Sequence, residues 1–169
     1  MWAAVGFGLA FLGVVVWFLV ASAALDDGAD DGASTGALRV EATGAAVAPF
    51  TGLTEARLAL GGDCLRLVVA DDLAERAAGL RNREAVAPYD GMLFVFDAPT
   101  TATFTMSGVS APLDIGFYDG DGTPVSRTRM QPCAKAAQDC PVYRADGPFV
   151  FAVETRPGGL AHGALARCP

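Results

Sequence analysis

The feature that most constrains the fold is a series of short apolar segments, separated by turn residues, that begins near residue 54. Apolar segments of four to eight residues bounded by Gly, Pro, Asn or Asp are typical of β-strands joined by tight turns. A weaker candidate strand lies at 38–41, before this series. The segments expected as strands are 55–60, 64–69, 92–96, 103–106, 113–118, 125–130 and 149–154.

One helix is expected among these strands. Asp72 and Glu75 have the spacing of a capping box at a helix N-terminus. Apolar residues then recur at i, i+4 and i+7, which predicts a short helix that ends near Arg81. One short helix among many hairpin-sized strands predicts a mainly β fold, namely a small antiparallel β-barrel or sandwich with one short helix.

The N-terminal segment predicts a membrane attachment. Residues 2–25 contain no charged side chain, and about 20 such residues span a bilayer as a helix. The alternative is a cleaved signal peptide, because Ala21, Ser22 and Ala23 resemble a cleavage site. No Lys or Arg precedes the apolar segment, which is also longer than a usual signal core, so a transmembrane helix over residues 1–25 is favoured.

The remaining chain divides into a linker and one domain. Residues 26–53 are rich in Ala, Gly, Asp and Thr with little periodicity, which predicts a flexible acidic linker. Residues 54–169 then form the β-rich domain. With so short an N-terminus, the simplest topology is a single-pass cell membrane protein whose C-terminal domain is extracytoplasmic; the alternative is secretion after signal cleavage.

The four cysteines agree with an exported domain. Cys64, Cys133, Cys140 and Cys168 are even in number and have no C-x-x-C spacing, as in a disulfide framework. Cys133 and Cys140 are expected to close a short loop, which leaves Cys64 and Cys168 as the second pair by elimination. The sequence alone allows three connectivities. Reduced thiols, or a redox-active pair at Cys133 and Cys140, are the alternatives.

Composition and motifs favour a binding module over an enzyme. Nineteen acidic and twelve basic residues give a net charge of −7, which argues against a nucleic acid partner. Lys135 is the single lysine and His162 the single histidine, and His162 has no neighbouring metal-ligand residues. Asp119 to Gly122 resemble half of a calcium loop, but a hairpin turn is favoured. No metal or cofactor is therefore predicted.

Asp114 is the candidate site residue, because it interrupts an apolar strand segment. An inward-facing carboxylate must be paired or hydrogen-bonded, and Arg76 and Arg83 are the expected partners. One interpretation is a fold-holding ion pair, or simple exposure on the outer face. The functional interpretation is a ligand pocket with Asp114 as its polar floor and with Thr105 and Ser107 at its rim.

Several segments together resemble a known family. They are 75–80, Arg83, 91–96, Phe104-x-Met106, 112–117, Asp121-Gly122 and 132–143. This order resembles domain of unknown function family 192 (DUF192), a prokaryotic family, over residues 54–163. The resemblance implies a compact β-rich fold with one short helix, in proteins that are often exported or membrane-tethered, and it implies no reaction.

The chain departs from this family at one segment. Where the family typically has Phe-Trp-Met-Lys-Asn-Thr, this sequence has Phe104-Thr-Met-Ser-Gly-Val109. The aromatic, cationic and amide side chains that would form a recognition patch are therefore replaced by Thr105, Ser107 and Gly108. The apolar positions Phe104 and Met106 are retained, so the fold is expected to persist while a shared activity is in doubt.

We therefore expect a membrane-tethered extracytoplasmic β-domain that acts as a non-catalytic binding or interaction module of the cell envelope. Its partners would be the membrane, through the N-terminal helix, and an unknown small molecule or envelope protein. The alternative is an envelope hydrolase or carbohydrate-active enzyme with Asp114 as acid or base. Carboxylate catalysis on a sugar needs a second carboxylate, for which Asp119, Asp121 and Glu154 are the candidates.

Overall fold

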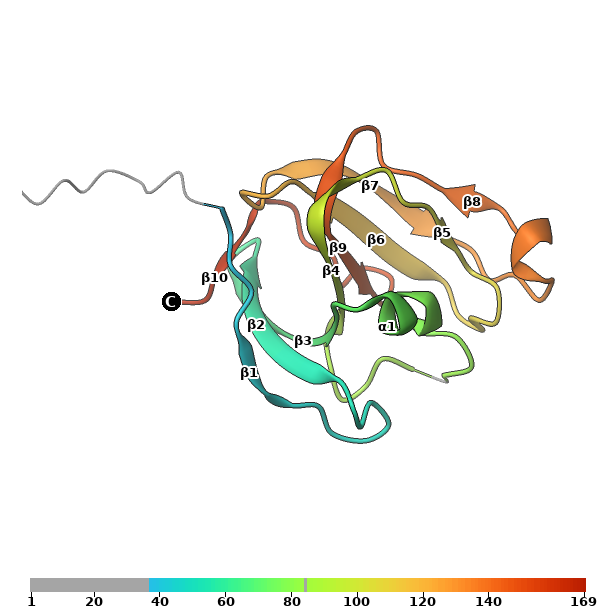
Figure 1. Cartoon of the computed structure of the whole chain (residues 1–169), viewed down its shortest axis with the longest axis horizontal. Helices are drawn as coiled ribbons and strands as arrows, with labels where there is room; N and C mark the ends of the chain where they lie inside the picture. The colour runs from blue at the N-terminus through green and yellow to red at the C-terminus, as the bar shows by residue number, and fades with distance from the viewer. Residues whose placement is uncertain (1–36, 84) are drawn as a thin grey trace, which may run out of the picture. The chain divides into compact units, whose positions relative to one another are not determined.

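An open eight-stranded sheet makes up most of the computed structural model, which describes residues 37–83 and 85–169 (Figure 1). Its strand order is β1-β2-β3-β4-β9-β6-β7, with β10 also paired to β2, while β5 and β8 form a separate pair. The elements are β1 (Ala42–Ala45), β2 (Thr54–Leu60), β3 (Asp63–Ala70), α1 (Leu73–Ala78), β4 (Gly91–Thr100), β5 (Phe104–Thr105), β6 (Leu113–Tyr118), β7 (Pro124–Met130), a 3-10 helix (Ala137–Asp139), β8 (Val142–Tyr143), β9 (Phe149–Thr155) and β10 (Leu165–Arg167).

The fold class is confirmed in part. The described chain is mainly β with one short α-helix, as the sequence predicts. The sheet does not close on itself, because β7 pairs only with β6 along the strand order, so the prediction of a barrel is wrong. Pro124 begins this edge strand, which carries Arg127 and Arg129.

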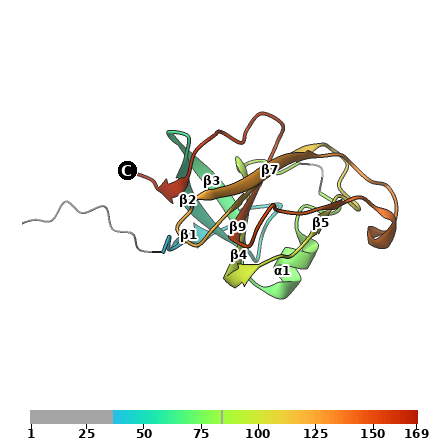
Figure 2. The same ribbon diagram turned by 90° about the horizontal axis from the view of Figure 1, so that it is seen from above.

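One strand pair differs from the expected antiparallel pattern. β3 and β4 are parallel, with Leu67 opposite Gly91 and Ala70 opposite Phe94. A parallel pair needs a crossover of a dozen or more residues, and the segment that contains α1 supplies it. Figures 1 and 2 both show α1 beside β5, where this crossover places it.

The predicted linker over 26–53 is partly folded. β1 pairs with β2, the Leu38 N–H donates to the Gly120 carbonyl (2.7 Å), and the Phe50 side chain is fully buried. The strand in this region is β1 at Ala42–Ala45 and not the expected 38–41. The flexible linker is therefore wrong for residues 37–53, where backbone pairing and burial of Phe50 fix the chain.

The predicted membrane anchor at 1–25 lies outside the described residues, as does the linker up to residue 36. Across 37–83 and 85–169, no helix has both the length and the apolar character needed to cross a bilayer.

Two apolar clusters pack on the two faces of the sheet, because successive side chains of a strand point to opposite sides. One cluster contains Phe94, Phe117 and Phe149 together with Leu80 from the end of the α1 segment. The other contains neighbouring strand residues such as Phe151. The α1 crossover therefore covers the first face, and a site at α1 rests on that cluster.

Both predicted disulfides are present. Cys133 pairs with Cys140 across seven positions, and Cys64 pairs with Cys168 across 104. Cys64 lies at the start of β3 and Cys168 directly follows β10, so this bridge fastens the end of the chain to the sheet.

Candidate functional site

A pocket of about 250 Å³ lies between α1, β4 and the segment 102–105. One wall comes from α1 and the three residues that follow it. The other comes from Phe94 and Phe96 of β4 and from Phe104 of β5. Glu154 of β9 also lines the pocket.

The capping box sets where α1 begins. Asp72 Oδ1 accepts from the Glu75 N–H (2.7 Å), and Glu75 Oε2 accepts from the Asp72 N–H (3.3 Å) and the Asp71 N–H (3.0 Å). The helix ends at Ala78 and is capped by Gly79, whose φ of 48° favours glycine. The end at Ala78 is earlier than the sequence predicts, so Arg81 belongs to a loop and lies at the pocket.

Aromatic rings form the apolar wall. The Phe94 and Phe104 rings meet edge to face, with centroids 5.1 Å apart. Phe104 also contacts the Phe117 ring at 5.6 Å, and Phe117 contacts Phe149 at 4.9 Å. Because the pocket wall continues into the core through these rings, its shape is held by core packing.

Glu154 is the unusual group in this pocket. Its side chain is 5% exposed and lies between Met92 of β4 and Ile115 of β6 in the strand register. Among the described residues, no side-chain hydrogen bond or ion pair to Glu154 is present. Burial raises the pKa of Glu154 to about 8. Glu154 is therefore mainly a neutral carboxylic acid at pH 7, able to donate a hydrogen bond.

Two guanidinium groups line the same pocket. Arg76 Nη1 donates to the Val95 carbonyl (2.9 Å) and to the Asp71 carbonyl, and its guanidinium lies over the Phe96 ring at 4.9 Å. Arg81 Nη2 donates to Thr105 Oγ1 (3.2 Å). Within 37–83 and 85–169, neither arginine forms an ion pair with a carboxylate.

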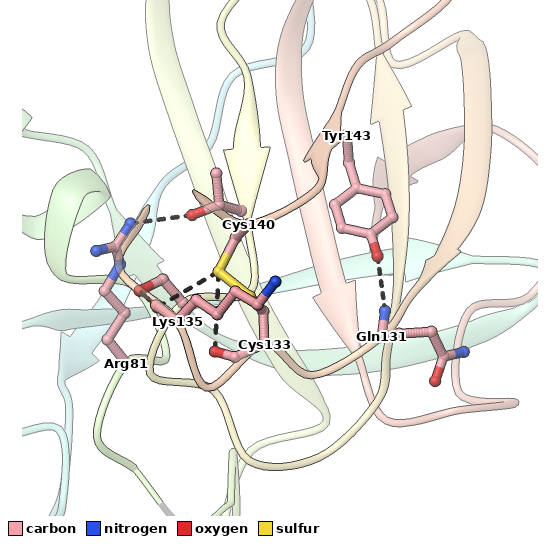
Figure 3. Close-up of a disulfide and its surroundings, with 8 residues drawn as sticks. Arg81, Gln131, Cys133, Lys135, Cys140 and Tyr143 are labelled. Atoms are coloured by element: carbon pink, nitrogen blue, oxygen red, sulfur yellow. Dashed lines mark hydrogen bonds between the residues drawn. A yellow bond between two sulfur atoms is a disulfide. The ribbon is translucent and has the colours of Figure 1, made fainter. Parts of the chain in front are cut away.

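The disulfide loop supports the segment that follows β5. The Cys133 N–H donates to the Met106 carbonyl (3.3 Å), and the Gly108 N–H donates to the Cys133 carbonyl (3.3 Å). Ser107 Oγ donates to the Lys135 carbonyl (2.8 Å). Figure 3 shows Arg81 beside the Cys133–Cys140 bridge, with its hydrogen bond as a dashed line. The bridge therefore stabilises the chain next to the pocket rim.

Asp114 does not have the partners expected from the sequence. Arg129 of the neighbouring strand donates to both Asp114 oxygens (2.7 and 3.1 Å), and the Gly158 N–H donates to Oδ2 (2.7 Å). These bonds, the Arg129 bond first, hold the pKa of Asp114 below its usual range. Pairing with Arg76 or Arg83 is therefore wrong, because the β6–β7 register places Arg129 directly opposite Asp114.

The other four predicted site residues lie at different places in the structure. Arg76 and Thr105 line the pocket that contains Glu154. Arg83 donates to the Pro49 carbonyl and lies over the Phe50 ring at 4.4 Å, beside a separate apolar pocket. Ser107 is buried against the disulfide loop. The structure thus brings two of the five residues to one site.

The hydrolase interpretation requires a second carboxylate beside Asp114, and the candidate Glu154 does not lie on the same face of the sheet. Asp114 pairs with Thr155 of β9, whereas Glu154 pairs with Ile115, so Asp114 and Glu154 point to opposite faces. Asp119 accepts from the Asp121 and Thr123 N–H groups (3.0 and 2.8 Å) and forms a turn. Across the described residues, no three metal-ligating side chains come together.

From the sequence, Glu154 is expected only as a partner for Asp114, whereas in the structure it lines the pocket. The available signal was a carboxyl group directly after the apolar segment 149–153. The strand register that puts it opposite Met92 and Ile115 is set by tertiary pairing, which a single sequence does not show.

Comparisons with known proteins give a family and a fold. The family model DUF192, described as uncharacterized ACR, matches residues 56–166. No curated protein matches. A protein of unknown function from Novosphingobium aromaticivorans DSM 12444 is similar, with 28% identity and a TM-score of 0.58 over 73% of this chain and 85% of that chain.

A second similar structure, from Sinorhizobium meliloti 1021, is provisionally assigned as a transcription regulator. It has 24% identity and a TM-score of 0.55 over 65% of this chain and 88% of that chain. At that identity the likeness concerns the fold alone.

Proposed function

This chain belongs to the DUF192 family, and we propose that it is a non-catalytic binding module that takes a small, partly apolar molecule into the pocket between α1, β4 and residues 102–105. The observation that carries the proposal is Glu154, whose carboxyl group bonds to no described side chain and opens into a pocket walled by aromatic rings. Ligand sites commonly combine apolar walls with a few convergent polar groups.

The placement of Glu154 supports this function. Among the described residues, no side-chain oxygen or nitrogen is both fully buried and without a hydrogen-bond partner, so the Glu154 carboxyl group opens into the pocket. A ligand that accepts a hydrogen bond from Glu154 would take the place of water at this group. The aromatic wall would at the same time bury the apolar part of that ligand.

We place this module outside the cytoplasm and tether it to the membrane. Support for the tether comes from the uncharged segment 2–25, and the two disulfides are typical of oxidising compartments. A protease-protection assay on intact and permeabilised cells tests the location. Cleavage of the domain only after permeabilisation of the inner membrane would contradict it.

A pair of tryptophan variants tests the pocket. Ala78 lies at the pocket on the exposed side of α1, so Ala78→Trp would narrow the entrance while leaving the core unchanged. Ala74→Trp on the same helix is the matched control, because Ala74 is exposed and does not line the pocket. The probe is benzyl alcohol, titrated into the full chain in lipid nanodiscs and followed by NMR.

The expected result is at least tenfold weaker binding to Ala78→Trp and unchanged binding to Ala74→Trp. Partition of the probe into lipid is equal for all three proteins and cancels in the comparison. Equal binding to both variants, or NMR changes confined to residues outside the pocket, would refute the proposed site.

A further inference from the structure

We propose that the ligand of this pocket is an amphipathic organic anion, a carboxylate on an apolar ring or short chain, with its head held by Arg76 and Arg81. This inference rests on the proposed binding function and adds the chemical class of the ligand.

The two arginines are already positioned for such a head group. The carbonyls of Asp71 and Val95 hold Arg76 Nη1, and Thr105 holds Arg81 Nη2, so each guanidinium is oriented before a ligand arrives. The planar fork of a guanidinium matches the two oxygens of a carboxylate. Since each arginine uses one terminal nitrogen for these bonds, its other N–H groups can donate to a ligand.

The net charge of the pocket also favours an anionic ligand. The charged side chains that line the pocket are Arg76 and Arg81, together with Glu154. Met92 and Ile115, the cross-strand neighbours of Glu154, are apolar, and burial is the cause that keeps Glu154 protonated. At neutral pH the pocket therefore carries positive charge that no described carboxylate neutralises.

Glu154 also contributes to recognition in this arrangement. As a neutral acid it does not repel an anion, and it can donate a hydrogen bond to an oxygen of the ligand. A cationic ligand would share the pocket with two guanidinium groups, and it would gain an ion pair only after Glu154 lost its proton. An anion meets neither obstacle.

Three probes that share a phenyl ring separate charge from apolar contact. They are benzoate, benzyl alcohol and benzyltrimethylammonium, titrated into the full chain in nanodiscs at pH 7. We expect benzoate to bind at least tenfold more tightly than benzyl alcohol, since hydrogen bonds to charged groups are stronger than those between neutral groups. We expect benzyltrimethylammonium to bind most weakly.

Arginine variants test which groups hold the anion. Arg81→Met and Arg76→Met should each weaken benzoate binding about tenfold and leave benzyl alcohol binding unchanged. Arg57→Met is the matched control, because Arg57 is exposed on β2 and does not line the pocket. Arg76 also bonds two carbonyls, so unfolding of each variant is measured; Arg81, an exposed side chain, carries the test if Arg76→Met does not fold.

A change of pH tests the role of Glu154. Above about pH 8 Glu154 ionises and repels the anion, so benzoate binding should weaken between pH 6.5 and 9. Glu154→Gln should remove this dependence because it stays neutral.

Tightest binding of benzyltrimethylammonium would overturn the ligand class while leaving the pocket function standing. Equal binding of all three probes would do the same. No binding of any probe would refute both the ligand class and the proposed function.

Discussion

Glu154 and Asp114 are both carboxyl groups on inner strands of the sheet, but their surroundings give them opposite properties. Arg129 and the Gly158 N–H lower the pKa of Asp114, whereas burial without a partner raises the pKa of Glu154. The sequence shows that Asp114 interrupts an apolar segment, which allows either a fold-holding ion pair or a pocket anchor. The structure shows an ion pair of Asp114 with Arg129. Its real partner depends on the β6–β7 register, which local sequence does not determine.

The raised pKa of Glu154 predicts a pH-dependent stability. In the unfolded chain Glu154 ionises near the ordinary value of 4.5, while in the folded protein it keeps its proton up to about pH 8. The unfolded state is therefore favoured increasingly as pH rises through this window, by up to about 1.4 kcal/mol per pH unit. Glu154→Gln should remove this slope.

Denaturant unfolding of the full chain at pH 5, 6.5 and 8 measures the effect. Asp114→Asn is a useful control, because the lowered pKa of Asp114 stabilises the fold above its ordinary value of 3.8 and that contribution disappears only at lower pH. If the unfolding free energies of wild type and Glu154→Gln change with pH in the same way, burial does not raise the pKa of Glu154.

Among the elements, α1 shows what local sequence can and cannot predict. The capping box at Asp72 and Glu75 is confirmed, because such a motif depends only on neighbouring residues. β6 likewise matches the expected 113–118. The parallel pairing of β3 with β4 and the short strands β8 and β10 depend on distant partners, so local sequence does not predict them.

Loss of the helix cap should therefore affect both the element and the pocket. Asp72→Ala removes the acceptor of the Glu75 N–H and should destabilise the protein by about 1 kcal/mol. Because Arg76 lies on this helix, benzoate binding should weaken as well. Thermal unfolding and probe titration measure the two effects, with Asp121→Ala in the distant β6–β7 turn as control. Unchanged binding to a destabilised Asp72→Ala protein would show that α1 does not position Arg76.

For the whole molecule, the sequence predicts the fold class and the disulfides better than it predicts which strands pair. A mainly β fold and both disulfides follow from segment length and cysteine spacing. The extent of the folded unit does not, since residues 37–53 look like a linker but bury Phe50 and add β1 to the sheet. These residues show no clear hydrophobic periodicity, because their order comes from pairing with β2 and not from a local pattern.

The two disulfides should differ in their effect on global stability. In the chain-entropy model, a bridge across 104 residues contributes about 5 kcal/mol and a bridge across seven about 2 kcal/mol. Replacing Cys64 and Cys168 by Ser should thus lower the unfolding free energy more than replacing Cys133 and Cys140. Denaturant unfolding of the two double variants makes the comparison. A larger loss for the Cys133–Cys140 variant would show that local support of the segment after β5 outweighs chain entropy.

The edge strand β7 affects how readily copies of this protein aggregate. An unpaired strand edge is a template on which a second copy of a protein can add by backbone hydrogen bonds. At this edge Pro124 lacks an N–H, and Arg127 adds a positive charge to the strand, whereas the charge of Arg129 is balanced by Asp114. The missing donor at Pro124 and the charge of Arg127 both make it harder for a second copy to extend the sheet at this edge, which opposes edge-to-edge aggregation at high concentration.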